Sequence, residues 1–267
     1  MKYQLLHKKV SSKTFEKINS FSTDDKIIDF CTGNKLFDFL FISETSLHFK
    51  CIETELQTLS EIYNPMSICR DIDVAYLSHN EGIKSISINE NFHLSETLDK
   101  NSAHRILGPL VKIGVRGISL ACLNGQLAIL IASLNKFFIY SNGTISKEIG
   151  CGKSGYSIAS NIKDSYLNEP QGIDFINEDR MLVADTENHC IREFSENHKL
   201  ICGDPSHKSL SPKKICYDRT KEIVYFLSNN YLKMVSCDSK FVKDAYEGEV
   251  ISFSLFENGD VFILERL

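Results

Sequence analysis

Two neighbouring stretches decide the fold of this chain: LNEPQGIDF at residues 167–175 and MLVADTENHCIREF at residues 181–194. Both contain short apolar runs of strand length that are bounded by turn-forming polar residues. Helical periodicity is almost absent elsewhere, and Asn-Gly pairs stand between strand-like runs at residues 124–125, 142–143 and 258–259. Asn-Gly is a strong hairpin signal. The pattern therefore predicts an all-β chain built as a meander of antiparallel hairpins.

The two stretches resemble the NHL repeat, whose consensus is approximately L-x-x-P-x-G-I followed by L-x-V-A-D-x-x-N-H-x-I-x-x-F. The resemblance covers both halves of one repeat, residues 167–194. It implies a β-propeller, a ring of four-stranded antiparallel blades. It also implies a structural role for Asp185, Asn188 and His189 at the turn between second and third strands. We expect Asp185 to accept turn amides, Asn188 to be left-handed and His189 to pack at the blade edge.

The remaining blades are found by weaker self-similarity to the Ile173-Asp174-Phe175 step. Comparable steps begin at isoleucines separated by 40, 50, 55, 42 and 36 residues, namely Ile28, Ile68, Ile118, Ile173, Ile215 and Ile251. A second apolar run follows each step, at residues 36–42, 74–77, 127–131, 181–184, 223–227 and 261–264. Propeller repeats are commonly about 40–45 residues long, and loop insertions lengthen some of them. We place such insertions at residues 98–115 and 151–167.

The last unit ends after two strands, whereas the chain begins with an unassigned strand pair at residues 2–8 and 14–21. Joining the two ends gives a wrapped interval of 44 residues, the expected repeat length. Closing the ring in this way removes free sheet edges. The sequence therefore predicts one six-bladed propeller over residues 1–267, with the sixth blade formed by residues 249–267 and 1–21.

Composition narrows the setting and the partners. The net charge of −5 gives no electrostatic reason for avid nucleic-acid binding. The nine cysteines form no C-x-x-C pair, which favours free thiols in a reducing, intracellular and cytoplasmic setting. The N-terminus has no apolar core of signal-peptide length. The apolar residues 117–140 contain Asn124-Gly125, so we interpret them as two strands and a tight turn and expect no membrane span.

The residue after each marker isoleucine is small and polar or carries a thiol. Because first strands converge on the central channel, we expect these side chains to line it: Asp29, Cys69, Ser119, Asp174, Cys216 and Ser252. The channel is expected to be narrow at the axis, so large side chains would collide there, and this accounts for the small size of these residues. An alternative is that Asp29 and Asp174 face each other and hold calcium or magnesium, although two carboxylates are few for such an ion. The eight histidines form no metal-spaced cluster, so we otherwise expect no cofactor.

Three functions are compatible with this sequence. The first is a non-enzymatic protein–protein interaction or scaffold propeller, acting alone or as one subunit of a larger assembly; an apolar patch near residues 107–113 would support it. The second is a metal-dependent hydrolase or lyase acting in the channel. The third is an RNA-binding propeller, for which the cluster Lys213, Lys214, Arg219 and Lys221 is the basic candidate. We interpret that cluster as a solvated loop, and we find no G-x-S-x-G, P-loop or HExxH motif.

Overall fold

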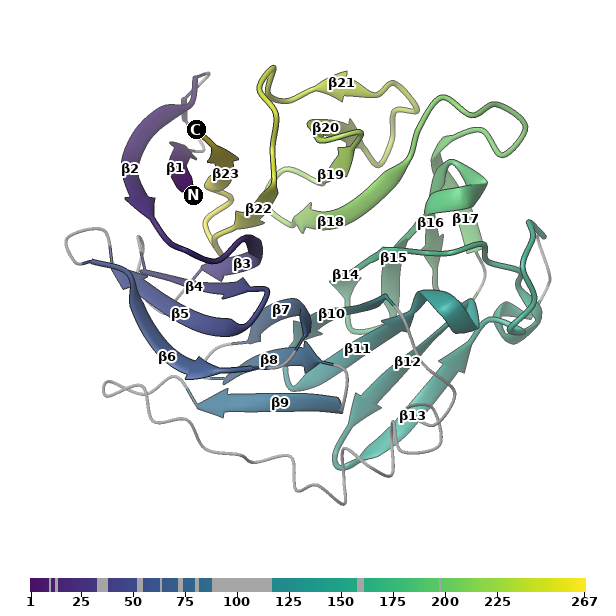
Figure 1. Cartoon of the computed structure of the whole chain (residues 1–267). Coiled ribbons are helices and arrows are strands. Elements are labelled where there is room, and N and C mark those ends of the chain that lie inside the picture. Colours follow the sequence, from purple (N-terminus) through teal and green to yellow (C-terminus); the bar gives the residue numbers. More distant parts are fainter. Residues whose placement is uncertain are drawn as a thin grey trace.

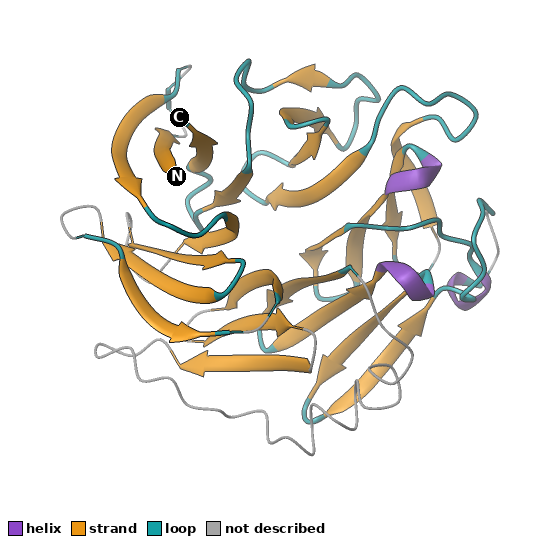
Figure 2. Cartoon of the chain, in the orientation of Figure 1, coloured by secondary structure: helices purple, strands orange, loops and turns teal. Residues whose placement is uncertain are grey.

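A computed structural model shows six β-sheets arranged radially around a central channel (Figures 1 and 2). It describes residues 1–9, 11–12, 14–32, 38–51, 55–62, 64–71, 74–79, 82–87, 117–157, 161–196 and 198–267. Neighbouring strands pair antiparallel throughout, and helix among these residues is limited to three single 3-10 turns: η1 (Ala132–Leu134), η2 (Ile162–Asp164) and η3 (Thr186–Asn188). The predicted six-bladed β-propeller is confirmed.

The blades follow one another along the chain, and the strand nearest the channel comes first in each. Blade 1 contains β3 (Ile27–Thr32), β4 (Asp38–Ser43), β5 (Ser46–Cys51) and β6 (Gln57–Glu61). Blade 2 contains β7 (Pro65–Asp71), β8 (Val74–His79) and β9 (Gly82–Ser87). Blade 3 contains β10 (Ile118–Leu123), β11 (Gln126–Ile131), β12 (Lys136–Ser141) and β13 (Thr144–Ile149).

The second half of the chain repeats this order. Blade 4 contains β14 (Gly172–Asn177), β15 (Arg180–Asp185), β16 (Cys190–Phe194) and β17 (His198–Gly203). Blade 5 contains β18 (Pro212–Asp218), β19 (Ile223–Ser228), β20 (Tyr231–Ser236) and β21 (Lys243–Asp244). Blade 6 combines β22 (Ser252–Leu255) and β23 (Val261–Arg266) with β1 (Lys2–Lys8) and β2 (Glu16–Ser22).

The two ends of the chain meet in blade 6. Its strand order is β2-β1-β23-β22, and the register places Leu5 opposite Leu264 and Tyr3 opposite Arg266. Figure 1 shows both termini in this one sheet. The predicted closure by the N-terminal strands is thus present, and the ladder that closes the ring is made of backbone hydrogen bonds between residues far apart in sequence.

The turn chemistry follows the sequence. Asn124-Gly125 and Asn142-Gly143 both have positive φ, 50° and 76° in the first pair and 50° and 79° in the second, as a two-residue hairpin turn requires. Residues 117–140 contain the two predicted strands, β10 and β11, joined by the tight turn; they also contain η1 and most of a third strand, β12, which the interpretation as two strands did not include. The insertion at residues 151–167 contains η2 and a single bridge, Ser154 to Leu167. The predicted insertion at residues 98–115 and the patch at 107–113 lie outside the described residues.

The hydrophobic core lies between the blades, because each sheet packs its faces on its two neighbours. One cluster, for example, joins Leu130 and Phe137 of blade 3 to Ile173 and Phe175 of blade 4. Five similar clusters fill the other gaps around the ring. All of these sheets converge at their first strands, so the closest backbone approaches occur beside the channel.

Gly172 marks such a close approach, where β14 meets β18 of the next blade. A Cβ atom added to Gly172 would lie 1.9 Å from the backbone oxygen of Lys213 and 2.9 Å from its carbonyl carbon. Backbone atoms of a packed strand cannot move aside as a flexible side chain can. The glycine of the NHL-like motif is therefore required by packing between blades.

We predict that Gly172→Ala lowers the free energy of unfolding by about 2 kcal/mol or more, as overpacking between two strands does. Urea denaturation measures the loss. The control is Gly143→Ala in an outer turn, where the added Cβ meets nothing within 4 Å and only the φ of 79° opposes it. That variant should lose about 1 kcal/mol. Equal losses in the two variants would contradict the packing argument.

Candidate functional site

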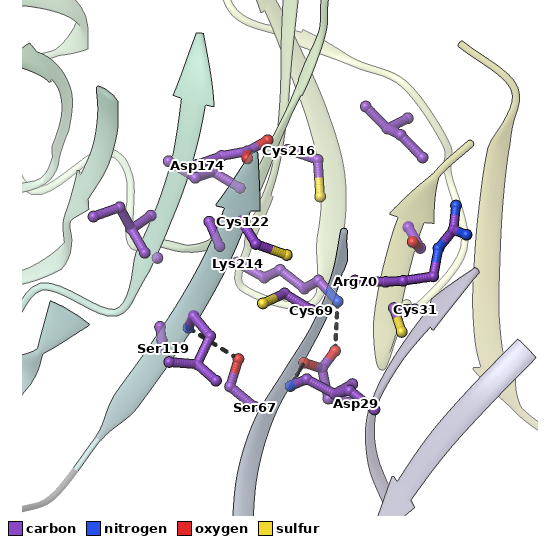
Figure 3. Close-up of a pocket in the computed structure, with 18 of the residues that line it drawn as sticks. Asp29, Cys31, Ser67, Cys69, Arg70, Ser119, Cys122, Asp174, Lys214 and Cys216 are labelled. Atoms are coloured by element: carbon purple, nitrogen blue, oxygen red, sulfur yellow. Dashed lines mark hydrogen bonds and ion pairs between the residues drawn. The ribbon is translucent and has the colours of Figure 1, made fainter. Parts of the chain in front are cut away.

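The central channel contains a cavity of about 750 Å³. Its wall includes every residue predicted to line the channel: Asp29, Cys69, Ser119, Asp174, Cys216 and Ser252. Figure 3 shows several of these side chains with others that the sequence analysis did not place there, including Ser67, Lys214 and two further cysteines. The cavity is therefore the first candidate for a functional site.

Side chains on the first strands bond to the neighbouring blade. Asp29 in β3 accepts the amide of Ile68 in β7 at 3.3 Å, which joins blades 1 and 2. The hydroxyl of Ser67 in β7 accepts the amide of Leu120 in β10 at 3.2 Å, which joins blades 2 and 3. These amides belong to strands whose channel-side edge has no further strand to pair with, so a side chain supplies the acceptor.

The same arrangement continues around the ring. Ser119 donates its hydroxyl to the carbonyl of Gln171 at 2.6 Å, joining blades 3 and 4. Asp174 accepts the amide of Tyr217 at 2.7 Å, joining blades 4 and 5. The remaining two joints are made by Lys214 and Ser252, described next.

Lys214 in β18 makes the contacts that complete the series of hydrogen bonds around the ring. Its ammonium donates to the Ser252 hydroxyl at 3.1 Å and to Asp29 at 2.5 Å, and Ser252 itself donates to Asp29 at 2.6 Å. Blades 5, 6 and 1 are thereby joined. We call the six side chains that make these contacts the channel belt: Asp29, Ser67, Ser119, Asp174, Lys214 and Ser252.

The two blades that carry a cysteine after the marker isoleucine build the belt differently. In blade 2 the belt residue is Ser67 and in blade 5 it is Lys214, each two positions before the cysteine. Successive side chains of a strand alternate between faces, so residues two apart share one face. In these two blades the residue that contacts the neighbouring blade therefore lies two positions earlier in the strand. Cys69 and Cys216 make none of the belt contacts.

Electrostatics explain how a lysine is tolerated in the channel. Burial is the largest single influence and lowers the pKa of Lys214, but the charge and hydrogen bond of the Asp29 carboxylate, 2.5 Å away, together with the neighbouring Cys216 and Cys31, outweigh it and the pKa is raised. The ammonium also donates to the carbonyl of Phe30 at 3.0 Å. Lys214 therefore places a positive charge in the channel. The sequence analysis did not predict that this lysine lies there.

The prediction that the basic cluster forms a solvated loop is wrong for Lys213 and Lys214, whereas Arg219 is exposed in the turn after β18. Lys213 and Lys214 lie in β18, and Lys214 enters the cavity. Arg219 donates to the carbonyl of Phe175 at 2.6 Å, and Lys221 pairs with Asp218 at 3.2 Å. The sequence cue failed because strand register, and not proximity along the chain, decides where consecutive charges point.

The carboxylates of Asp29 and Asp174 do not fit the metal alternative well. Both oxygens of Asp29 accept protein donors, one of them the Lys214 ammonium. Both oxygens of Asp174 accept backbone amides, from Phe175 at 2.8 Å and Tyr217 at 2.7 Å. Within the described residues no group of three or more His, Cys, Asp or Glu side chains is placed to hold an ion. A calcium or magnesium site needs more oxygen ligands than these residues bring together.

All nine cysteines are free, four of them buried and five half-buried. Burial raises the pKa of Cys31 and of Cys216, both on the cavity wall, to about 12. Each of these two thiols is therefore protonated at neutral pH. Because the thiolate is the nucleophilic form, neither has the character of an activated catalytic cysteine.

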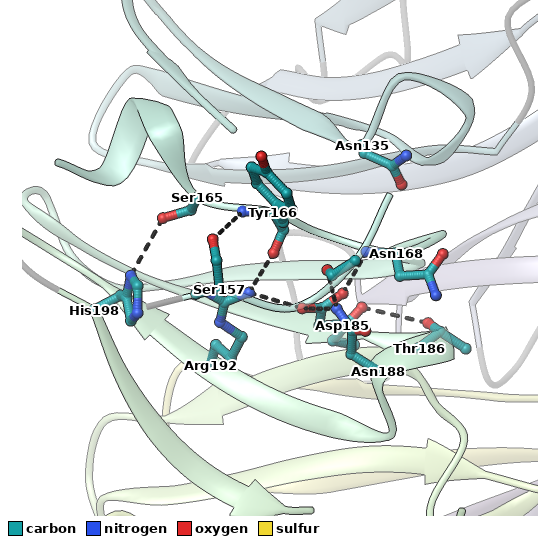
Figure 4. Close-up of polar contacts among 12 residues, drawn as sticks. Asn135, Ser157, Ser165, Tyr166, Asn168, Asp185, Thr186, Asn188, Arg192 and His198 are labelled. Carbon is teal, nitrogen blue, oxygen red and sulfur yellow. Dashed lines mark hydrogen bonds and ion pairs between the residues drawn. The ribbon is translucent and has the colours of Figure 1, made fainter. Parts of the chain in front are cut away.

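A second polar network lies in blade 4, where the NHL-like motif is found (Figure 4). Asp185 and Arg192 form an ion pair at 2.9 Å, and neither residue has any exposed surface. Asp185 also accepts the amide of Asn168 at 2.8 Å and the side-chain amide of Asn188 at 2.9 Å. These contacts bind the end of the insertion to the turn after β15.

The left-handed residue of this turn is His189, with φ 57° and ψ 31°, and not Asn188 as predicted. Asn188 ends η3 and is buried, because its amide bridges Asp185 and the carbonyl of Gly155. His189 contacts the Leu210 carbonyl at 2.8 Å through Nδ1 and so joins blade 4 to the segment before blade 5. Asn135 occupies the corresponding left-handed position in blade 3.

Comparison with known proteins agrees with this architecture. Residues 167–194 match the NHL repeat family. Among solved structures, the WD40 β-propeller domain of Doa1 is similar with a TM-score of 0.57 and 13% identity, over 97% of this chain and 78% of that one. No match was found among curated protein sequences. The chain is thus a six-bladed β-propeller in which residues 167–194 match the NHL repeat. In the described residues no helix is long and apolar enough to cross a membrane.

The Asp29–Lys214 contact yields a quantitative prediction. Asp29→Asn should lower the free energy of unfolding by about 1–3 kcal/mol, because the Lys214 ammonium loses its counter-charge while it remains partly desolvated. The double variant Asp29→Asn/Lys214→Met should recover part of that loss. Urea denaturation of the wild type, both single variants and the double variant forms the required cycle. Additive single effects would contradict the pairing.

The same contact has a pH signature. Because the pKa of Lys214 is raised in the folded state, its stabilisation is complete below the unfolded value of about 10.4 and is lost as the pH rises through the folded value. The stability difference between wild type and Lys214→Met should therefore be constant near neutral pH and shrink at alkaline pH. A difference that stays constant above pH 10.4 would count against the ion pair.

Proposed function

We propose that this chain is a non-enzymatic protein-interaction propeller that binds a protein partner through the face on which residues 150–157 and 161–171 lie. We call this the loop face; it also includes the turns at residues 132–135 and 186–189 and the segment 204–211. The observation that carries the proposal is that blade 4 holds the two described parts of the insertion, residues 151–157 and 161–167, through Arg192. Propeller folds host many functions, so the site and not the fold must support it.

Arg192 is the anchor of the insertion. Its guanidinium donates to the carbonyls of Tyr166 at 2.7 Å and Ser157 at 2.8 Å, and it lies over the Tyr156 ring. These partners stand on both sides of the insertion, so one buried side chain fixes its two arms. Burying an arginine costs free energy that a hydrophobic residue would not, which suggests that loop geometry is what the pair provides.

A loop held in this way is suited to binding. Ordering a flexible loop on association costs free energy, and a loop already ordered avoids that loss. Lys153, Lys163 and Asp164 on the insertion are exposed, and so is Lys208 on the neighbouring segment. The polar side chains of the channel, by contrast, are engaged in joining blades. This division favours a partner at the loop face over chemistry in the channel.

The nine free thiols support a reducing, intracellular and cytoplasmic location for such a complex. The nucleic-acid alternative receives less support, because Lys214 and Lys221 of the basic cluster are paired with carboxylates. We therefore place protein partners first and expect the chain to act as a scaffold or as one subunit of an assembly.

The test begins with chemical cross-linking of the tagged protein in its own cells, which identifies a partner for reconstitution. Binding of the purified partner is then measured by calorimetry for wild type and for Lys153→Glu/Lys163→Glu. We expect the double charge reversal to weaken binding about tenfold or more, equivalent to about 1.4 kcal/mol.

The matched control is Lys17→Glu on β2, an exposed lysine of blade 6 that is not among the residues of the loop face. It should bind as wild type does. A partner that binds all three proteins with one affinity would exclude the loop face, and a well-folded protein that forms no complex in its cells would exclude the scaffold function.

A further inference from the structure

The central cavity extends to the end of the channel that lies away from the loop face. β14 and β18 begin directly after loop-face segments, and each blade repeats the same strand order, so the first strands end at this other mouth. Here the cavity wall includes Arg70 near the end of β7, Arg219 directly after β18 and Glu257 in the turn after β22. We call these three residues the arginine mouth. None of them belongs to the channel belt.

Arg70 already contacts a carboxylate at this mouth. Its Nη2 atom lies 3.4 Å from the carboxylate of Glu257, which comes from blade 6. The Arg70 side chain is 9% exposed, whereas the Glu257 side chain is 75% exposed. A long ion pair with one partner in solvent contributes little free energy. A dissolved anion can therefore replace the Glu257 carboxylate without disturbing the fold.

Arg219 places a second guanidinium on the same wall. It belongs to blade 5, which is three blades from blade 2 and so stands on the opposite side of the six-bladed ring. Its Nη2 atom donates to the carbonyl of Phe175 at 2.6 Å, which orients the side chain, and the residue is exposed. A guanidinium has five N–H donors, so this contact leaves donors that a ligand can use.

Four aspartates also lie on the cavity wall, and each already accepts hydrogen bonds from the protein: Asp29, Asp71, Asp174 and Asp218. The charge of Asp29 is balanced by Lys214 at 2.5 Å, and that of Asp218 by Lys221 at 3.2 Å. Backbone amides donate to the other two carboxylates at 2.6–2.8 Å. The aspartates are thus held in place, and the exposed Glu257 is the carboxylate that a ligand would replace.

The size of the cavity suits a small molecule. Its volume of about 750 Å³ lies within the range of roughly 300–1,000 Å³ that is typical of ligand sites. Figure 3 shows Arg70 and Lys214 at this cavity together with several thiols. The thiols of Cys31 and Cys216 and the side chain of Leu123 add weakly polar surface to the wall. A ligand can therefore present an anionic group to the mouth and a less polar part to the wall.

We propose that the arginine mouth binds a small organic anion whose carboxylate or phosphate group replaces the Glu257 carboxylate at Arg70 and is also attracted by Arg219. Arginine recognises both groups through the same chemistry, because its planar fork donates two parallel hydrogen bonds to an oxyanion. Binding involves no covalent step and leaves the belt contacts intact. The site is separate from the loop face, so it adds a ligand to the proposed function and does not depend on it.

The test is an NMR titration of the full-length protein, with inorganic phosphate in one series and succinate in the other. The side-chain Nε–H signals of Arg70 and Arg219 report on the site directly. We expect saturable shifts of both signals with at least one probe. Saturation by phosphate alone assigns a phosphorylated ligand, saturation by succinate alone assigns a carboxylate ligand, and saturation by both assigns a general oxyanion site.

Two variants of exposed residues should change the affinity in opposite directions. Arg219→Gln should weaken binding of the saturating probe about tenfold or more, because a charge-assisted hydrogen bond is lost. Glu257→Gln should strengthen it about two- to fivefold, because the competing carboxylate is removed from Arg70. A merely structural role for Glu257 would not produce tighter binding. Thermal unfolding of each variant confirms that it is folded.

The matched control is Arg180→Gln in blade 4. Arg180 pairs with Glu193 at 2.7 Å and is not part of the cavity wall, so this variant should bind the probe as the wild type does. The proposal would be overturned if neither probe shifts the two arginine signals to saturation. Equal weakening by Arg180→Gln and Arg219→Gln would also overturn it, as would a Glu257→Gln protein that binds no more tightly than the wild type.

Discussion

The first strand of each of the six blades lies beside the channel. On its channel side this strand has no neighbouring strand with which to form backbone hydrogen bonds. An unpaired amide costs free energy where water is scarce, so the edges must find other partners. The channel belt supplies them, for example through Asp29 to the amide of Ile68 and Asp174 to the amide of Tyr217. The rest of the structure depends on this constraint, because directional hydrogen bonds from the belt set the positions of the first strands, whereas apolar contact between blades is non-directional.

The belt also decides where function can lie. Its carboxylates and its lysine are engaged with one another and with backbone groups, which leaves them unsuited to hold a divalent ion or a substrate. The proposed binding function lies on the loop face, where Arg192 of blade 4 contacts both described parts of the insertion. In the channel itself, the positions released from the belt are those of the cysteines.

Much of this architecture could be predicted from the sequence. The NHL-like stretch fixed the repeat, and the isoleucine steps located all six first strands because strand patterning and repeat length are local properties. The left-handed residue was misplaced by one position, since Asn188 and His189 both suit a turn and only the contact of Asn188 with Asp185 separates them.

Other features depended on three-dimensional contacts. The role of Lys214 was missed because it pairs with Asp29, at a distance of 185 residues along the chain. The sequence did contain a signal for the position of Lys214. The two blades with a cysteine at the channel position have a polar residue two positions before it, in Ser67-Ile68-Cys69 and Lys214-Ile215-Cys216. The anchoring of the insertion by the buried Arg192 had no such signal, because the motif leaves that position unspecified.

Amide hydrogen exchange measured by NMR tests the central claim most directly. The amides of Ile68, Leu120 and Tyr217 lie at the channel edge of their strands and bond only to belt side chains of the neighbouring blade. If the belt joins the blades, these amides exchange as slowly as those in the ladders of the same sheets. Exchange as fast as that of exposed turns, such as Gly143, would show that the belt does not hold the ring together.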